Sequence, residues 1–184
     1  MATAQYVALL RGINVGGKNP VPMAALREAF EGAGFGRVRT YIQSGNVLFE
    51  TDRPAQGLEV EVEGLLERRF GIPLMVVVRS HRQLRSTIAK APPGFGTRPD
   101  EFHSDVIFLR SPLTPRRAMG VTRLREGVDQ AWAGTGALYF ARLSARRTQS
   151  KMSSIVGTPE YRLMTIRSWS TTTKLLTLLD SPPD

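Results

Sequence analysis

Residues 38–51 read VRTYIQSGNVLFET, and two β-prone runs in this stretch, 38–43 and 47–51, are separated only by Ser44-Gly45-Asn46. The connection is short and rich in turn-forming residues, so the stretch predicts an antiparallel hairpin. Gly45 is expected to have a positive φ, a backbone conformation in which a Cβ is costly.

The elements predicted on either side of this hairpin give it its place in the fold. Before it, residues 6–10 form an apolar run typical of a buried strand, and apolar residues at helical spacing predict a helix over 22–31. After it, helical spacing predicts a second helix over 58–70, and residues 74–78 predict a strand rich in valine. The order β-α-β-β-α-β is that of a ferredoxin-like split unit, and residues 81–90 add a helix.

The rest of the chain predicts the same order again. Strands are expected at 105–109, 129–132, 137–141 and 161–165, and helices at 115–121, 150–156 and 168–179. The prediction is therefore an α+β fold of two ferredoxin-like subdomains packed together, residues 1–91 and 97–184, with a C-terminal helix. A proline- and glycine-rich linker, 91–96, separates them. A single larger α+β sheet is the alternative.

Composition excludes several classes of site. The 184 residues include no cysteine, so disulfides, a thiolate nucleophile and cysteine-ligated zinc are excluded. No apolar run approaches the length of a membrane span, and the first residues lack the basic segment of a signal peptide. We expect a cytoplasmic protein without a membrane partner, and the oligomeric state is left open.

Positive charge is concentrated in the C-terminal half. Residues 110–174 contain twelve Lys or Arg and three acidic residues, so this segment accounts for the whole net charge of +9. Such an excess indicates an anionic partner, nucleic acid being the first candidate. Arginine-rich codon composition is the alternative explanation.

Residues 12–19, GINVGGKN, nearly match the phosphate-binding pattern G-x-x-x-x-G-K-[ST]. Asn19 lacks the hydroxyl that would hold Mg²⁺. Pro20 and Pro22 delay the helix that would complete the anion site, so helix geometry begins at Pro22 at the earliest. The pattern therefore predicts a glycine turn suited to an anion and not a nucleotide triphosphatase.

Three segments carry a resemblance to a known family. The stretches 10–19, LRGINVGGKN, and 40–47, TYIQSGNV, resemble the signature segments of the bacterial family called domain of unknown function 1697, and 165–171, TIRSWST, resembles a third. Members usually have asparagine where this chain has Ser168. The resemblance implies an α+β fold with ferredoxin-like parts and implies no activity, substrate or cofactor.

The glycine loop and the hairpin turn form the candidate site. Strands one and three of a split unit are antiparallel neighbours, so the loop after the first strand and the turn before the third are expected at the same sheet edge. Cations, backbone N–H groups and neutral hydrogen-bonding groups at one edge suit a phosphate-bearing small ligand. The predicted ligand-binding residues are Arg11, Asn14, Gly16, Gly17, Lys18, Gln43, Ser44 and Asn46. The alternative is structural: the glycines supply positive φ and the asparagines cap turns.

Other chemistry has little support, and the sequence does not decide whether the chain is an enzyme. His81 and His103 have no partner at ligand spacing, so no metal site and no cofactor are predicted. The third strand lacks the stacking aromatics of an RNA-recognition motif. Any nucleic-acid binding would be electrostatic and non-sequence-specific, through Arg142, Arg146, Arg147, Lys151 and Arg167. A structural or interaction protein with no ligand is the remaining alternative.

Overall fold

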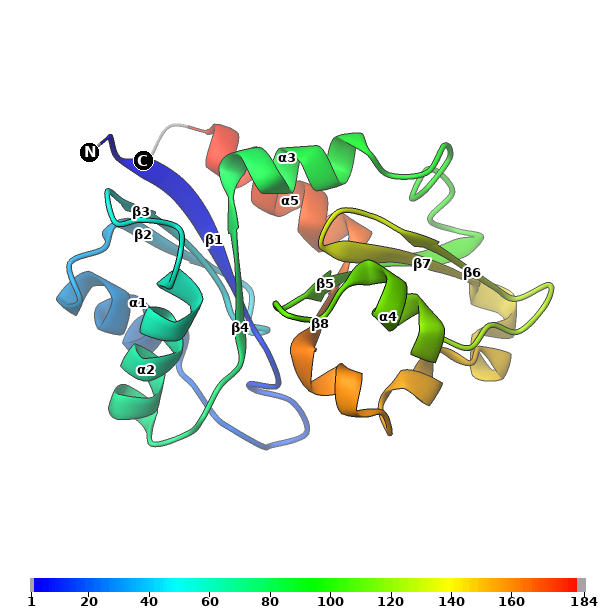
Figure 1. The fold of residues 1–184 in the computed structure, drawn as a ribbon, viewed down its shortest axis with the longest axis horizontal. Coiled ribbons are helices and arrows are strands. Elements are labelled where there is room, and N and C mark those ends of the chain that lie inside the picture. Colours follow the sequence, from blue (N-terminus) through cyan, green and yellow to red (C-terminus); the bar gives the residue numbers. More distant parts are fainter. Residues whose placement is uncertain (1, 182–184) are drawn as a thin grey trace. The chain divides into compact units, whose positions relative to one another are not determined.

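A computed structural model describes residues 2–181 and divides into two compact units. The first unit comprises Met1–Arg85 with Leu175–Asp184, and the second comprises Ser86–Lys174. Each unit contains a four-stranded antiparallel sheet accompanied by helices, so the predicted α+β class is confirmed (Figure 1).

The first unit has the predicted order of elements. It contains β1 (Ala4–Leu10), α1 (Met23–Gly32), β2 (Gly36–Tyr41), β3 (Asn46–Thr51), α2 (Leu58–Phe70) and β4 (Val76–Ser80). The strands are ordered β2-β3-β1-β4, and β1 pairs antiparallel with both β3 and β4. This is the ferredoxin-like arrangement expected from the hairpin and its flanking helices.

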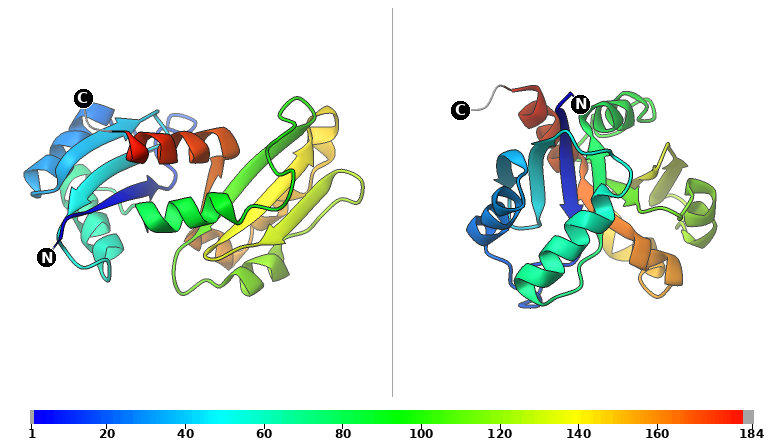
Figure 2. Two further views of the ribbon diagram at one scale, coloured as in Figure 1. Left: turned by 90° about the horizontal axis from the view of Figure 1, so that it is seen from above. Right: turned by 60° about the vertical axis from the view of Figure 1, so that its left-hand side comes forward.

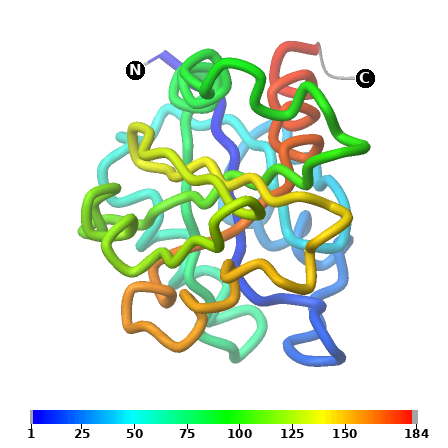
Figure 3. The backbone as a smooth tube through the Cα atoms, turned by 90° about the vertical axis from the view of Figure 1, so that its right-hand side faces the viewer, coloured from blue at the N-terminus to red at the C-terminus, as the bar shows by residue number. Residues whose placement is uncertain are grey.

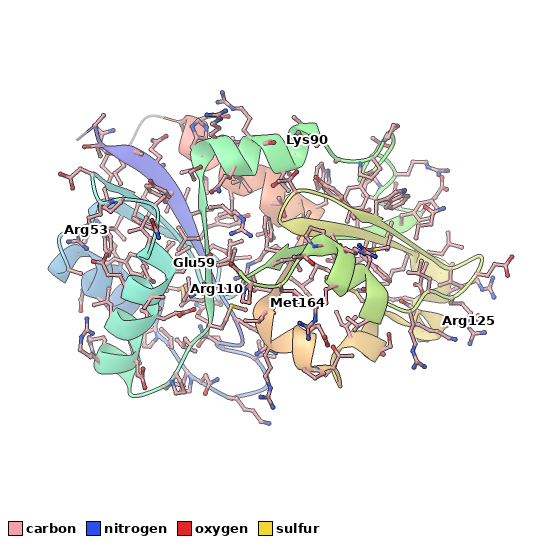
Figure 4. The ribbon with its side chains drawn as sticks, viewed as in Figure 1. Arg53, Glu59, Lys90, Arg110, Arg125 and Met164 are labelled. Carbon is pink, nitrogen blue, oxygen red and sulfur yellow. The ribbon has the colours of Figure 1, made fainter. Side chains whose placement is uncertain are left out.

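Helices α1 and α2 lie side by side on one face of this sheet (Figure 2). Alternate residues of β1, Tyr6, Ala8 and Leu10, join the core beneath them, because side chains two residues apart point to the same face. Glu59 of α2, labelled in Figure 4, accepts a hydrogen bond of 3.0 Å from the backbone N–H of Val78 in the edge strand β4. Helix α2 thus also satisfies a backbone donor that the edge of a sheet leaves unpaired.

The second unit has a sheet with the same strand order, but among its described residues it has no α-helix between its third and fourth strands along the chain. Its strands are β5 (Phe102–Leu109), β6 (Asp129–Ala133), β7 (Ala137–Leu143) and β8 (Met164–Ser168), in the order β6-β7-β5-β8, and its helix is α4 (Pro115–Val121). Helices α3 (His81–Ala89) and α5 (Trp169–Asp180) each contribute residues to both units. Met164, labelled in Figure 4, is fully buried in the core of the second unit.

The helix predicted over 150–156 is wrong. Three short 3₁₀ segments, Ser144–Gln149, Met152–Ile155 and Pro159–Leu163, run between β7 and β8 (Figure 3). Met152 and Ile155 are buried three residues apart, a spacing that a 3₁₀ turn satisfies as well as an α-helix. The strand predicted over 161–165 begins only at Met164, because the last 3₁₀ segment occupies its first half.

The stretch predicted as a linker, 91–96, belongs to the second unit. The ring of Phe95 makes edge-on contacts with Trp132, Tyr139 and Trp169, with centroid distances of 6.0, 5.4 and 5.1 Å. The division between the units falls instead within helix α3, after Arg85, and residues from Leu175 onward belong to the first unit. Among the described residues, no helix is long and apolar enough to span a membrane.

Candidate functional site

The glycine loop and the hairpin turn are in direct contact at one end of the first sheet. The backbone N–H of Leu10, the last residue of β1, donates a 2.9 Å hydrogen bond to the carbonyl of Gly45. The side-chain amide of Asn14 donates to the carbonyl of Gln43 at 2.9 Å. Gly45 has a φ of 83°, as expected from the sequence.

The tip of the loop is a tight turn. Lys18 N–H donates to the carbonyl of Val15 at 3.0 Å, and both central residues have positive φ, 56° at Gly16 and 73° at Gly17. Positive φ at both central positions is typical of a type I′ turn. All four residues of this turn are exposed, and the N–H groups of Gly16 and Gly17 have no hydrogen-bond acceptor among residues 2–181. The tip therefore presents two backbone donors and the Lys18 ammonium to solvent.

The base of the loop is built into the core. Ile13 and Val21 are each 1% exposed and pack with the core of the first unit. Asn14 joins the two arms of the loop, since it accepts from Val21 N–H at 2.8 Å and donates to Val21 O at 2.9 Å. Helix α1 begins at Met23, seven residues after the turn's first glycine, so no helix N-terminus follows the glycines directly.

Two of the predicted ligand-binding residues, Asn14 and Asn46, make internal hydrogen bonds. The Asn46 side chain is fully buried and donates to the carbonyl of Tyr41 at 2.8 Å and to the Ser44 hydroxyl at 3.1 Å. The Asn14 side chain is occupied by the three hydrogen bonds that join the loop arms to each other and to the turn. Both amides therefore help to hold the loop and the turn in shape. The remaining predicted residues are Arg11, Gly16, Gly17, Lys18, Gln43 and Ser44.

The five basic residues named for nucleic acid separate into two groups. Arg146, Arg147 and Lys151 are exposed on the segment that follows β7. Arg167 is 6% exposed and donates to Thr165 and to the carbonyl of Ile166, both at 2.9 Å, and its burial lowers its pKa to about 10. Its guanidinium therefore does not belong to an exposed basic surface.

Arg142 is also engaged inside the second unit. Its guanidinium lies 3.6 Å from Asp105 and donates to the sulfur of Met152 at 3.0 Å. The other oxygen of Asp105 lies 3.2 Å from His103 Nε2. Burial raises the pKa of Asp105, against the opposing effects of His103 and Arg142.

The pairing of His103 with Asp105 was missed at the sequence level. Residues two apart in a strand share a face, so the strand assignment contains the signal. The predicted strand began at Asp105, whereas β5 begins at Phe102 and includes His103. The described residues contain no group of three His, Cys, Asp or Glu side chains able to hold a metal ion.

Comparisons with known proteins agree with this fold. The family model described as "Protein of unknown function (DUF1697)" matches residues 3–139. The structure of the conserved bacterial protein SP0830 from Streptococcus pneumoniae is similar, with a TM-score of 0.82 and 24% sequence identity. The similarity covers 97% of this chain and 99% of that one. No curated protein matches this chain.

Proposed function

Since the chain belongs to the family of unknown function DUF1697, whose description assigns no activity, we propose from the geometry of its glycine loop that it binds a phosphate-bearing small ligand there. The observation that carries the proposal is the turn Val15–Lys18, whose two glycine N–H groups and lysine ammonium share one exposed tip. Backbone N–H groups and a cation at one place can donate hydrogen bonds to the same phosphate group.

The hairpin turn contributes the second side of this site. Gln43 is exposed and Ser44 half-buried, and the Asn14–Gln43 hydrogen bond holds their backbone against the glycine loop. Arg11 is half-buried at the start of the loop, where its N–H donates to the carbonyl of Met75. The hydrogen bonds of Asn14 fix the base of the loop and so lower the entropy that ordering the site would cost on binding.

Thermal unfolding in the presence of inorganic phosphate, nucleotides and sugar phosphates tests the proposal. A ligand present at a hundred times its Kd should stabilise the wild-type protein by about 2.7 kcal/mol. Lys18→Gln should weaken this ligand about tenfold without lowering the melting temperature of the free protein. Lys90→Gln is the matched control, because Lys90 is also exposed but lies outside the loop. Absence of any shift, or equal shifts for Lys18→Gln and wild type, would contradict the proposal.

The exposure of Arg146, Arg147 and Lys151 favours a second candidate function, electrostatic nucleic-acid binding. The carboxylate of Asp129 accepts hydrogen bonds from the backbone N–H of Arg125 and Lys151, at 2.9 and 2.8 Å, and so orders the segment that carries these cations. A plot of the logarithm of the affinity for duplex DNA against the logarithm of the salt concentration should have a slope of about −0.9 per contacted phosphate. The double change Arg146→Ala and Arg147→Ala should reduce that slope by roughly two. No binding at low salt excludes this function.

A further inference from the structure

The second unit contains a pocket of about 400 Å³ that the glycine-loop proposal does not involve. Two segments far apart in the sequence line it, one reaching from Gly96 to Ser104 and the other from Ser168 to Thr173. Its apolar walls are Pro99, Phe102 and Trp169. Its polar walls are His103 and four hydroxyl groups, those of Ser104, Ser168, Ser170 and Thr173. A volume of this size accommodates a small organic molecule.

Ser104, one of the lining residues, has a hydroxyl that is unpartnered among residues 2–181. Ser104 is 8% exposed, and its buried hydroxyl has no hydrogen-bond partner in the described part of the chain. An unsatisfied buried hydroxyl is costly, so a native protein usually provides it with a partner. Ser104 also lines a smaller adjoining hollow of about 130 Å³ beside Gln130 and Trp132. A molecule in the pocket would supply the missing partner.

His103 is a further residue that lines the pocket. Asp105, whose side chain is 7% exposed, holds His103 Nε2 at 3.2 Å, whereas the His103 side chain is 41% exposed. The carboxylate fixes the orientation of the ring, and the exposure of the His103 side chain makes it a reporter for a molecule bound in the pocket.

The first turn of α5 forms a second wall of the pocket. Ser168 caps this helix, since its hydroxyl accepts the N–H of Thr171 at 3.2 Å. The helix has twelve residues, and the N-terminus of a helix carries partial positive charge and unpaired N–H groups. The Ser168 hydroxyl donates to the Thr171 hydroxyl at 3.0 Å and lies 3.0 Å from the Ser170 hydroxyl, so the hydroxyls at this helix end form hydrogen bonds with one another. This end of the pocket favours a negatively charged group.

We propose that this pocket binds a small aromatic or heteroaromatic carboxylate. Its carboxylate would lie at the N-terminus of α5, among the hydroxyls and within reach of His103, and its flat ring against Trp169 and Phe102. Among residues 2–181 no lysine or arginine lines the pocket, so a singly charged carboxylate fits better than a phosphate dianion. Trp169 is held in place by the edge-on contact with Phe95, which keeps its indole as a rigid wall.

The two histidines of the chain provide the assay. Long-range ¹H–¹⁵N correlation spectra resolve the His81 and His103 rings, and His81→Gln assigns them. Benzoate and nicotinate should shift the His103 resonances in a saturable way and leave those of His81 unchanged, because His81 pairs with Asp180 in the first unit. Benzamide, the neutral analogue of benzoate, should bind about tenfold more weakly, since it lacks the charge.

Variants separate recognition by the pocket from a general effect on the protein. Ser104→Ala and Ser170→Ala should each weaken benzoate several-fold, whereas Ser153→Ala, an exposed serine outside the pocket, should not. Failure of both aromatic acids to shift His103 in the wild-type protein overturns the proposal. Equal binding of benzamide, or tighter binding of inorganic phosphate at His103, overturns the carboxylate assignment. Phosphate acting at the glycine loop leaves His103 unshifted, so the two proposals fail separately.

Discussion

Ile13 Cδ1 would lie 2.6 Å from a Cβ on Gly45, closer than two such carbons approach in folded proteins. The Cβ of Leu10 would be 2.9 Å from the same atom. The hairpin turn therefore fits against the glycine loop only because position 45 has no side chain. This contact, with the hydrogen bond from Leu10 N–H to Gly45 O, sets the distance between the two halves of the proposed phosphate site.

Gly45→Ala should destabilise the first unit by about 2–4 kcal/mol, from the positive φ and the overlap with Ile13 together. Gly17→Ala is the control for φ alone: its φ is 73°, and an added Cβ meets no atom within 4 Å. That change should cost only about 1 kcal/mol. Urea unfolding of both variants measures the difference, and equal losses would mean that the Ile13 contact adapts freely.

Asn14→Ala should cost roughly 2–3 kcal/mol in the free energy of unfolding, because three hydrogen bonds to Val21 and Gln43 are lost. Gln43→Ala should cost less than about 0.5 kcal/mol, since Asn14 binds its carbonyl and not its exposed side chain. Asn14→Gly keeps the residue's positive φ of 53° accessible and so isolates the hydrogen bonds. A Gly variant as stable as wild type would show that the bonds contribute nothing.

Tyr139→Phe tests a buried hydrogen bond in the second unit. The Tyr139 hydroxyl donates to the carbonyl of Thr87, and its removal should cost about 1–2 kcal/mol at neutral pH. Burial raises the pKa of Tyr139 above the ordinary value of 10.0. The unfolded chain ionises first, so wild type should lose stability relative to the Phe variant as pH rises from 10 through the folded pKa. Denaturation of both proteins at several alkaline pH values measures how the difference between their free energies of unfolding decreases.

Asp105→Asn should reveal the cost of burying a carboxylate. Because burial raises the pKa of Asp105 above 3.8, the folded state holds the proton more tightly than the unfolded state. The resulting stabilisation is complete below pH 3.8 and is lost as pH rises through the folded pKa. Asparagine does not ionise, so the variant should gain stability relative to wild type as pH rises across this interval. If it instead loses stability, attraction by His103 and Arg142 outweighs burial.

Much of the fold could be read from local patterns. Apolar residues at helical spacing predicted α1 and α2 to within one residue at their ends, and the turn Ser44-Gly45-Asn46 predicted the hairpin of β2 and β3. The same logic failed over residues 150–156. There only two apolar residues, Met152 and Ile155, needed burial, and a single 3₁₀ turn buries both. Periodicity over so few residues does not distinguish the two helix types.

The sequence by itself determined the antiparallel hairpin, the glycine turn and their common sheet edge, because these depend on neighbouring residues and on strand order. Only the tertiary structure decided which side chains at this edge make internal hydrogen bonds and which are exposed to solvent. Asn14 and Asn46 became internal supports because backbone groups brought beside them required partners. Likewise, the pocket beside His103 joins two segments more than sixty residues apart, and their meeting depends on the pairing of β5 with β8. Burial and hydrogen-bond partners are properties of the packed chain, and no local pattern contains them.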